Sequence, residues 1–222
     1  MASRINSEGK LILVRHGQST YNLENKFTGW KDVPLTILGE KEAHAAGVIL
    51  SQNKIHHAYT SKLKRAQKTL NTILSYNASD PSIILNPALN ERDYGDLIGQ
   101  NKEDAVKRFG ADQVQIWRRS YNTPPPGGES LEMTYDRTVP YFIDNILDKA
   151  MKSNVIISAH GNSIRAIIKY LFNYTNDEIL KTEIGWCEPW IVSFNNKSIT
   201  NFIVLNRPDA KSMSFFPRHP VK

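Results

Sequence analysis

The chain has 222 residues, of which 40% are apolar and 23% are charged, and this ordinary composition argues against a disordered chain. Its 28 Lys and Arg exceed its 22 Asp and Glu by six, and this positive net charge favours an anionic partner. A single cysteine excludes an intramolecular disulfide and a cysteine-based zinc site. The sequence contains neither a secretory signal nor a run of ~18 apolar residues, so we expect a cytoplasmic protein without a membrane partner.

Apolar runs and helical periods divide the first hundred residues into alternating elements. In chain order, the sequence predicts a strand over 10–14, a helix from the cap Thr36 to about Asn53, a strand over 55–60, a helix capped by Ser61 and ending near Leu74, and a strand over 82–85. A loop rich in polar residues is predicted over 86–99.

The alternation continues in the second half of the chain. Asn101 and Asp112 are predicted to cap two short helices, and a loop rich in proline and glycine is predicted over 123–128. A long helix from Ser130 to about Lys152 precedes a strand over 154–158, a helix over 163–172 and a strand pair over 190–194 and 199–205. We expect a mobile tail from about Asp209.

Strands that alternate with helices are typical of one fold class. The pattern predicts an α/β fold in which helices cover both faces of a mainly parallel sheet. We expect a single domain over residues 1–222.

Two of the predicted strands end in the same dipeptide. His16-Gly17 follows the strand over 10–14, and His160-Gly161 follows the strand over 154–158. Ligands of open α/β sheets bind beyond the carboxyl ends of the strands, so neighbouring strands would bring both imidazoles into one crevice. A histidine at a strand end can also simply bond a backbone carbonyl, but the repetition, with Arg15 beside one copy, favours a site.

An arginine beside a histidine indicates phosphoryl chemistry rather than a transition-metal site. A neutral imidazole nitrogen is a good nucleophile toward phosphorus, and a guanidinium binds phosphate oxygens through two N–H groups. Glu91 is a candidate general acid and base, although it could equally pair with a cation. Further cations are expected at the same sheet edge, and the candidates are Arg65, Arg92, Lys102, Arg118 and Arg119.

These residues stand within a longer series of motifs that resembles one family. In this order, and over about residues 10–181, the motifs resemble the cofactor-dependent phosphoglycerate mutases of the histidine phosphatase superfamily. They are LVRHGQSTYN at 13–22, FTGW at 27–30, YTSKLKRA at 59–66, LNERDYG at 89–95, NK at 101–102, WRR at 117–119, GES at 128–130 and AHGNS at 159–163.

The resemblance implies an enzyme of glycolysis and gluconeogenesis that interconverts 2-phosphoglycerate and 3-phosphoglycerate. It implies priming by 2,3-bisphosphoglycerate, no metal, and a homodimer or homotetramer. It also implies that His16 carries the phosphoryl group, that Glu91 transfers a proton, and that Arg15, Arg65 and His160 surround the transferring phosphate. The implied substrate-binding residues are Asn22, Thr28, Gly29, Arg92, Tyr94, Lys102, Arg118, Arg119, Gly161 and Asn162.

One segment departs from the pattern of that family. Members usually have a Thr-Gly-x-Pro run near the position where this chain has Gly185-Trp186-Cys187-Glu188-Pro189, and only the proline clearly matches. This segment lies close to the end of the stretch that resembles the family, so the resemblance does not predict the backbone conformation of residues 185–189.

Three other functions are weighed against this one. A phosphatase of the same superfamily would use the same catalytic residues but would not need the second-phosphate clamp implied for Lys102, Arg118 and Arg119. A nucleic-acid-binding module would need clustered cations interleaved with aromatic residues, whereas the basic residues are spread along this chain. A non-catalytic relative would have lost catalytic residues, and all of them are present.

Overall fold

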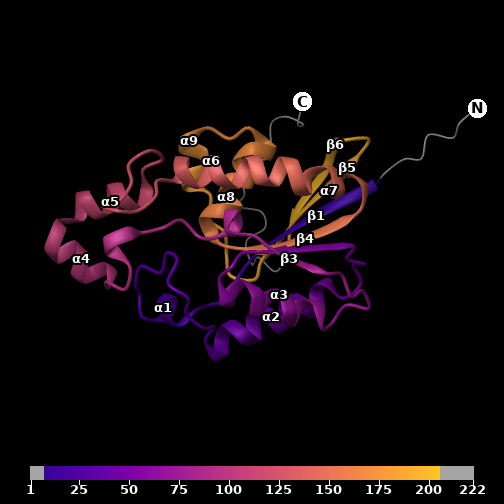
Figure 1. The fold of residues 1–222 in the computed structure, drawn as a ribbon, viewed down its shortest axis with the longest axis horizontal. Helices are drawn as coiled ribbons and strands as arrows, with labels where there is room; N and C mark the ends of the chain where they lie inside the picture. Colours follow the sequence, from indigo (N-terminus) through magenta and orange to yellow (C-terminus); the bar gives the residue numbers. More distant parts are fainter. Residues whose placement is uncertain (1–7, 206–222) are drawn as a thin grey trace, which may run out of the picture.

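The computed structural model describes residues 8–205, and the predicted tail from about Asp209 lies outside them (Figure 1). One six-stranded sheet has the order β3-β2-β4-β1-β5-β6. The pairs β1–β4, β2–β4 and β2–β3 are parallel, whereas β5 runs antiparallel to both of its neighbours, which confirms a mainly parallel α/β sheet. The strands are β1 (Glu8–Arg15), β2 (His57–Thr60), β3 (Ile83–Leu85), β4 (Asn154–Ala159), β5 (Pro189–Asn195) and β6 (Ser198–Val204).

Helices join most of these strands. The long predicted helix is present as α6 and α7, joined by a π-helical turn over Ile143–Leu147. Short 3₁₀ turns over Pro87–Leu89 and Gly95–Leu97 interrupt the predicted loop. The helices are α1 (Thr20–Leu23), α2 (Ile37–Leu50), α3 (Lys64–Leu74), α4 (Lys102–Phe109), α5 (Ala111–Arg119), α6 (Leu131–Phe142), α7 (Asp148–Lys152), α8 (Gly161–Phe172) and α9 (Asn176–Lys181).

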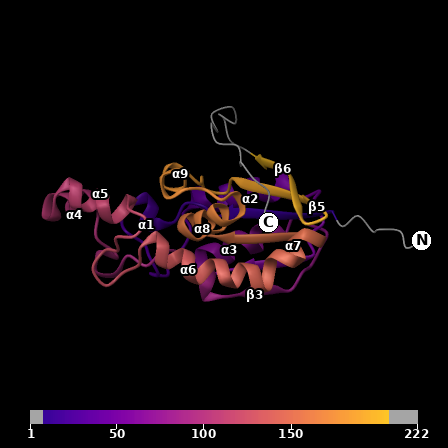
Figure 2. The ribbon, with the colours of Figure 1, turned by 90° about the horizontal axis from the view of Figure 1, so that it is seen from above.

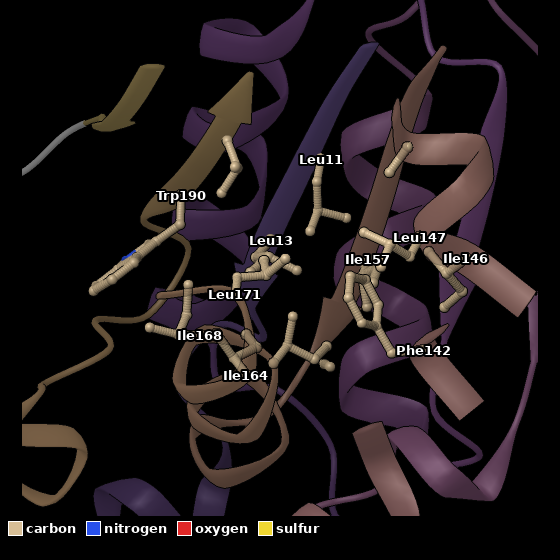
Figure 3. Close-up of a cluster of buried hydrophobic side chains, with 14 of the residues drawn as sticks. Leu11, Leu13, Phe142, Ile146, Leu147, Ile157, Ile164, Ile168, Leu171 and Trp190 are labelled. Carbon is tan, nitrogen blue, oxygen red and sulfur yellow. The ribbon is translucent and has the colours of Figure 1, made fainter. Parts of the chain in front are cut away.

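The pleat of the central strands divides the core into two layers. Leu11 and Leu13 of β1 pack on one face with apolar residues of α6, α7 and α8, while Ile12 and Val14 pack on the other face with residues of α2 and α3. Figure 3 shows the first layer, in which Leu13 lies near Ile164 on α8. Because successive strand side chains alternate between faces, a continuous apolar run is what two helical layers require.

Two predicted helix caps are wrong. The third helix has Leu63 at its N-cap rather than Ser61, because the Ser61 hydroxyl lies 2.8 Å from a ring nitrogen of His160 and the backbone is still extended at Leu63. The fifth helix begins after Gly110 rather than at Asp112, since the positive φ of 86° at this glycine ends α4 and starts α5 without a side-chain cap.

The predicted caps Thr36, Asn101 and Ser130 are confirmed by side-chain oxygens that accept backbone N–H groups of their helices. Figures 1 and 2 show α4 and α5 at one end of the molecule, away from the sheet. A small separate cluster around Phe27, Leu97 and Trp117 holds this lobe together. Within residues 8–205, no helix has both the length and the apolar character needed to cross a bilayer.

Candidate active site

The two His-Gly dipeptides meet at the carboxyl ends of two neighbouring parallel strands. β1 pairs with β4 in a register that places Arg15 opposite Ala159, so His16 and His160 leave the sheet side by side. Their ring centroids are 5.0 Å apart with an edge-to-face orientation, and both side chains are buried. The structure therefore brings the predicted pair together in the crevice beyond the sheet.

His16 is held with one ring nitrogen bonded and the other directed at a cation. Its Nδ1 donates to the carbonyl oxygen of Gly17 at 2.7 Å, and since a carbonyl can only accept, Nδ1 carries the proton. The lone pair of Nε2 then accepts the Nε–H of Arg65 at 3.3 Å. Burial, followed by the charges of Arg65 and Arg15, holds the pKa of His16 well below its ordinary value of 6.5. The imidazole is therefore neutral at physiological pH, as a nucleophile must be.

The loop after His16 leaves no room for a side chain at Gly17 or at Gly39, which packs against it. A Cβ on Gly17 would collide with the carbonyl oxygen of Gly39, and a Cβ on Gly39 would collide with that of Gln18. The start of α2 thus packs directly on the backbone that carries His16, which fixes the position of the ring. At Gly161 the nearest atoms are side-chain atoms of two arginines rather than backbone. A Cβ there would lie 3.4 Å from Arg165 and 3.7 Å from Arg15.

Two arginines, buried Arg65 and partly buried Arg15, lie beside the histidine pair. Arg65 donates to the carbonyl oxygens of Lys31 and Gly29, each at 2.9 Å, and burial lowers its pKa to about 10. Arg15 donates from Nη1 to the carbonyl oxygen of Ile184 at 2.7 Å, while its buried Nε has no partner among the residues described. Both guanidiniums stay cationic at neutral pH, and the charges of both act on the His16 ring.

His160 is oriented by a serine. The Ser61 Oγ lies 2.8 Å from Nε2 of His160 and also accepts the backbone N–H of Leu63, so its own hydrogen is available to Nε2. In that arrangement Nδ1 of His160 carries the proton, and this buried nitrogen has no hydrogen-bond partner within residues 8–205. Burial, with the charge of Arg65 next, holds the pKa of His160 well below 6.5. The ring can thus offer a neutral N–H donor.

Glu91 is bonded through one of its two carboxylate oxygens. Oε1 accepts the backbone N–H of Arg92 at 2.7 Å and both the backbone and side-chain N–H of Asn162, at 3.2 and 2.9 Å. Asn162 stands in the first turn of α8, where the helix dipole also favours a carboxylate. No hydrogen bond of the described chain reaches Oε2, so this oxygen is available to a ligand proton.

A pocket of about 760 Å³ opens beside these groups. All of the predicted site residues except Arg92 and His160 contribute to its wall. The His160 ring packs edge-to-face against that of His16. Buried Arg92 stacks over the Tyr94 ring at 4.7 Å and donates to its hydroxyl at 2.8 Å. Burial raises the pKa of Tyr94, but the charge and hydrogen bond of Arg92 outweigh this and bring that pKa below its ordinary value.

The wall also contains residues that the sequence did not indicate, namely Lys26, Phe27, Arg165 and Glu183. Arg165 lies one turn into α8, and burial lowers its pKa to about 10. Its Nε donates to the carbonyl oxygen of Thr182 at 2.8 Å. Its position three residues after Asn162, on the helix that follows His160, is the only sequence signal that could have found it.

Glu183 is one of two carboxylates in a wall whose described residues include seven Lys and Arg side chains. One of its oxygens lies 2.9 Å from Nη2 of Arg119 and the other lies 3.2 Å from Nη2 of Arg165. The side chain is 57% exposed, so it stands at the mouth of the pocket rather than inside it. Even with this carboxylate, the pocket has a strong net positive charge and suits an anion.

The segment that departs from the family pattern encloses Arg15. The backbone N–H of Cys187 donates to the carbonyl oxygen of Arg15 at 2.9 Å, and the Trp186 ring lies 5.6 Å from the guanidinium. Cys187 has a positive φ of 50°, where a glycine would be unstrained, and its side chain is buried. Burial raises the pKa of this thiol, so it is not a reactive group.

The unpaired polar atoms around the pocket fit a multiply charged phosphate ester. Nε of Arg15 and Nδ1 of His160 are buried donors that lack partners among the residues described, which costs free energy unless a ligand binds them. A second group of cations, Lys102, Arg118 and Arg119, reaches the same pocket from the α4–α5 lobe. Between residues 8 and 205, no group of three His, Cys, Asp or Glu side chains is arranged to hold a metal ion.

Known proteins resemble this chain over most of its length. The family model described as the histidine phosphatase superfamily (branch 1) matches residues 11–204. The chain is 50% identical to a 2,3-bisphosphoglycerate-dependent phosphoglycerate mutase of Mesorhizobium japonicum, over 85% of this chain and 93% of the relative. It is 49% identical to a protein of the same name from Bartonella henselae, over 86% of this chain and 95% of the relative.

Solved structures share the fold at lower identity. The alpha-ribazole phosphatase of Shigella flexneri superposes with a TM-score of 0.77 at 24% identity, over 89% of this chain and 96% of that one. A putative alpha-ribazole-5'-P phosphatase of Escherichia coli gives a TM-score of 0.76 at 22% identity, over 90% and 96%. At these identities the likeness extends to the fold alone.

Proposed function

The chain belongs to the histidine phosphatase superfamily, and we propose that it is a 2,3-bisphosphoglycerate-dependent phosphoglycerate mutase that interconverts 2-phosphoglycerate and 3-phosphoglycerate. The observation that carries this proposal is the neutral His16 in a pocket with two sets of cations, one around the ring and one on the α4–α5 lobe. A monophosphatase needs only the first set. Relatives with this name at 49–50% identity over most of the chain support the same conclusion.

The first set of cations suits the phosphoryl group in transfer. Nε2 of His16 forms the N–P bond as the O–P bond to the substrate alcohol breaks, and Arg15, Arg65 and the Nδ1–H of His160 stabilise the equatorial oxygens. Arg65 already directs its Nε–H at Nε2, so the phosphoryl group has to enter between the two. His160 is neutral and can donate its proton in a hydrogen bond without losing it.

In this proposal Glu91 moves the proton that the transfer step requires. The departing alcohol oxygen takes a proton from Glu91, and an attacking hydroxyl returns one in the reverse direction. Asn162 and the Arg92 backbone fix Oε1, which leaves Oε2 for the exchange. The same residue therefore acts as acid and base in successive transfers.

The second set of cations suits the anionic group that is not transferred. Lys102, Arg118 and Arg119 would hold the far end of the ligand, with Asn22, Thr28 and the Tyr94 hydroxyl as neutral donors. Burial, together with the neighbouring Arg118, lowers the pKa of Lys102, which a bound anion would reverse. When bound in this pocket, 2,3-bisphosphoglycerate supplies the phosphoryl group that His16 carries.

The proposal is tested by an enolase-coupled assay on 3-phosphoglycerate, with and without 2,3-bisphosphoglycerate. We expect isomerisation that depends on the bisphosphate, and acid-labile phosphate on the protein after incubation with it. His16→Ala should abolish both signals, whereas His44→Gln, a change at an exposed histidine of α2, should leave them unchanged. Phosphate release at the same rate with or without the bisphosphate, and no isomerisation, would show a phosphatase instead.

A further inference from the structure

The loop that carries Glu91 is bound from behind by an arginine of α6. Nη1 of Arg137 donates to the carbonyl oxygens of Ala88 and Asn90, at 2.9 and 3.2 Å. Its Nη2 donates to the carbonyl oxygen of Glu91 at 2.8 Å. This loop lies outside the sheet, so its carbonyls have no strand partner, and one guanidinium satisfies three of them.

The arginine is itself fixed by a carboxylate. Glu129 accepts from Nε of Arg137 at 2.8 Å and from Nη2 at 2.9 Å, and both side chains are largely buried. The second oxygen of Glu129 also accepts the backbone N–H of Asp93 at 2.9 Å. Burial raises the pKa of Glu129, but the hydrogen bond and charge of Arg137 outweigh it and hold the pKa below its ordinary value. The pair thus forms hydrogen bonds to the backbone before Glu91, at Asn90, and after it, at Asp93.

A tryptophan completes this support. The ring of Trp30 lies 5.6 Å from the guanidinium carbon of Arg137, and its indole N–H donates to the same Glu91 carbonyl oxygen. Lys in place of Arg could not reproduce this arrangement, because an ammonium is a point donor and lacks the planar fork. The chemistry of the contact therefore depends on the guanidinium and not merely on a positive charge.

We propose that Arg137, anchored by Glu129, is a positioning residue for the proton transfer at Glu91, which fixes the backbone from which the carboxylate reaches the ligand. The proposal rests on the proposed function, in which Glu91 exchanges a proton with the substrate oxygen. Arg137 does not line the pocket and is not expected to touch substrate.

Arg137→Lys is the variant that tests it, with Arg108→Lys, a change at an exposed arginine of α4, as the matched control. We expect kcat for phosphoglycerate to fall by roughly 10- to 100-fold with KM changed less than about threefold, because a small misplacement of a reacting group has this effect on rate. Glu129→Gln should also lower kcat while changing KM little, but the decrease in kcat should be smaller. An unchanged kcat, or a rise in KM that accounts for the whole loss, would overturn the proposal.

A second substrate separates misplacement of Glu91 from general damage. p-Nitrophenyl phosphate has a weakly basic leaving group that needs little help from a proton donor, so its burst of nitrophenolate should be nearly the same in wild type and Arg137→Lys. A burst reduced as much as phosphoglycerate turnover would mean that the variant has lost the phosphoryl site itself, and the positioning role would be wrong. If the wild type does not isomerise phosphoglycerate, the proposed function fails, and the role of Arg137 is then tested by hydrolysis of an alkyl phosphate, whose leaving alcohol needs a proton. Arg137→Lys should slow hydrolysis of the alkyl phosphate much more than that of p-nitrophenyl phosphate, and an equal effect on both would overturn the role.

Chemical rescue gives an independent readout. Arg137→Ala leaves a space the size of a guanidinium beside three carbonyls that have each lost a donor, and added guanidinium ions at low concentration should restore part of kcat. Sodium ions at equal ionic strength should not. Rescue by both salts, or by neither while the variant keeps wild-type melting behaviour, would contradict the proposal.

Discussion

Nε of Arg65 lies 3.3 Å from Nε2 of His16 and donates its hydrogen to it, so the cation that would bind the phosphoryl group also keeps the nucleophilic nitrogen free of a proton. The charge of Arg65 is the largest contribution after burial to the lowered pKa of His16. Arg65 therefore serves both the binding of the phosphoryl group and the deprotonation of His16. Its removal should change both the rate of the reaction and its dependence on pH.

Arg65→Gln should lower kcat/KM by roughly 10²- to 10³-fold, the cost of removing one donor to a developing oxyanion. Without the positive charge the pKa of His16 rises, so a larger share of the imidazole is protonated at a given pH. The acidic limb of kcat/KM against pH should therefore move to higher pH. Lys64→Gln, at an exposed cation one residue earlier in α3, serves as control. A profile that keeps its acidic limb in place would contradict the coupling.

Glu91→Gln retains the shape of the side chain and removes its proton exchange. We expect kcat to fall by about 10²- to 10⁴-fold, the usual contribution of a general acid or base. Affinity for vanadate, measured by calorimetry, should stay the same or increase, because a negative charge has left an anion pocket. Weaker vanadate binding would indicate that Glu91 serves mainly to hold Asn162 and the phosphate site.

Glu183→Gln should tighten the binding of phosphoglycerate. The carboxylate pairs with Arg119 and Arg165, and a ligand anion has to compete with it for both. Because a screened charge of this kind is worth on the order of 1 kcal/mol, KM should fall by roughly two- to tenfold. Glu188→Gln, whose carboxylate accepts the Gly185 N–H, is the control outside the pocket wall. A higher KM would mean that Glu183 orients Arg119 for the ligand instead.

The free energy of unfolding should decrease as the pH falls below about 6.5. His16 and His160 are buried with pKa values well below that figure, whereas in the unfolded chain they titrate near ~6.5. Above this pH both states are neutral at these positions. Below it only the unfolded chain takes up protons, so stability falls by up to ~1.4 kcal/mol per pH unit for each histidine.

Urea unfolding at pH 7.5, 6.5 and 5.5 measures this dependence. The double variant His16→Asn/His160→Asn should give a flatter profile between pH 6.5 and 5.5 than the wild type. An equally steep profile in the variant would assign the pH dependence to other groups.

The sequence predicts the parts of this fold that local chemistry decides. At the caps Thr36, Asn101 and Ser130 the side-chain oxygen accepts an N–H of the first turn of its own helix, a local contact that the residue type predicts. Ser61 was assigned to a helix that begins two residues further on, because its hydroxyl is engaged with His160 at a large sequence separation. No local pattern reveals such a contact.

The short helices and the outer wall of the pocket show the same limit. α1 and α9 have four and six residues, too few for a helical period to appear in the sequence. Arg92 follows Glu91 directly, yet its side chain lies under Tyr94 and not in the pocket, while Arg165 reaches the wall through the rotation of α8. Tertiary packing determines where the Arg92 and Arg165 side chains point, and the order of residues in the sequence does not reveal that packing.

The position of β1 in the sheet also determines when, during synthesis of the chain, His16 and His160 can come together. β1 is flanked by β4 and β5, and both of these strands are made late in synthesis, long after His16 has been added to the chain. A nascent chain that stops before β4 has β1 without either neighbour and His16 without the burial that keeps it neutral. Parallel pairing over so long a separation is slow to form. The nucleophile is therefore latent through most of translation and becomes competent only as the centre of the sheet closes.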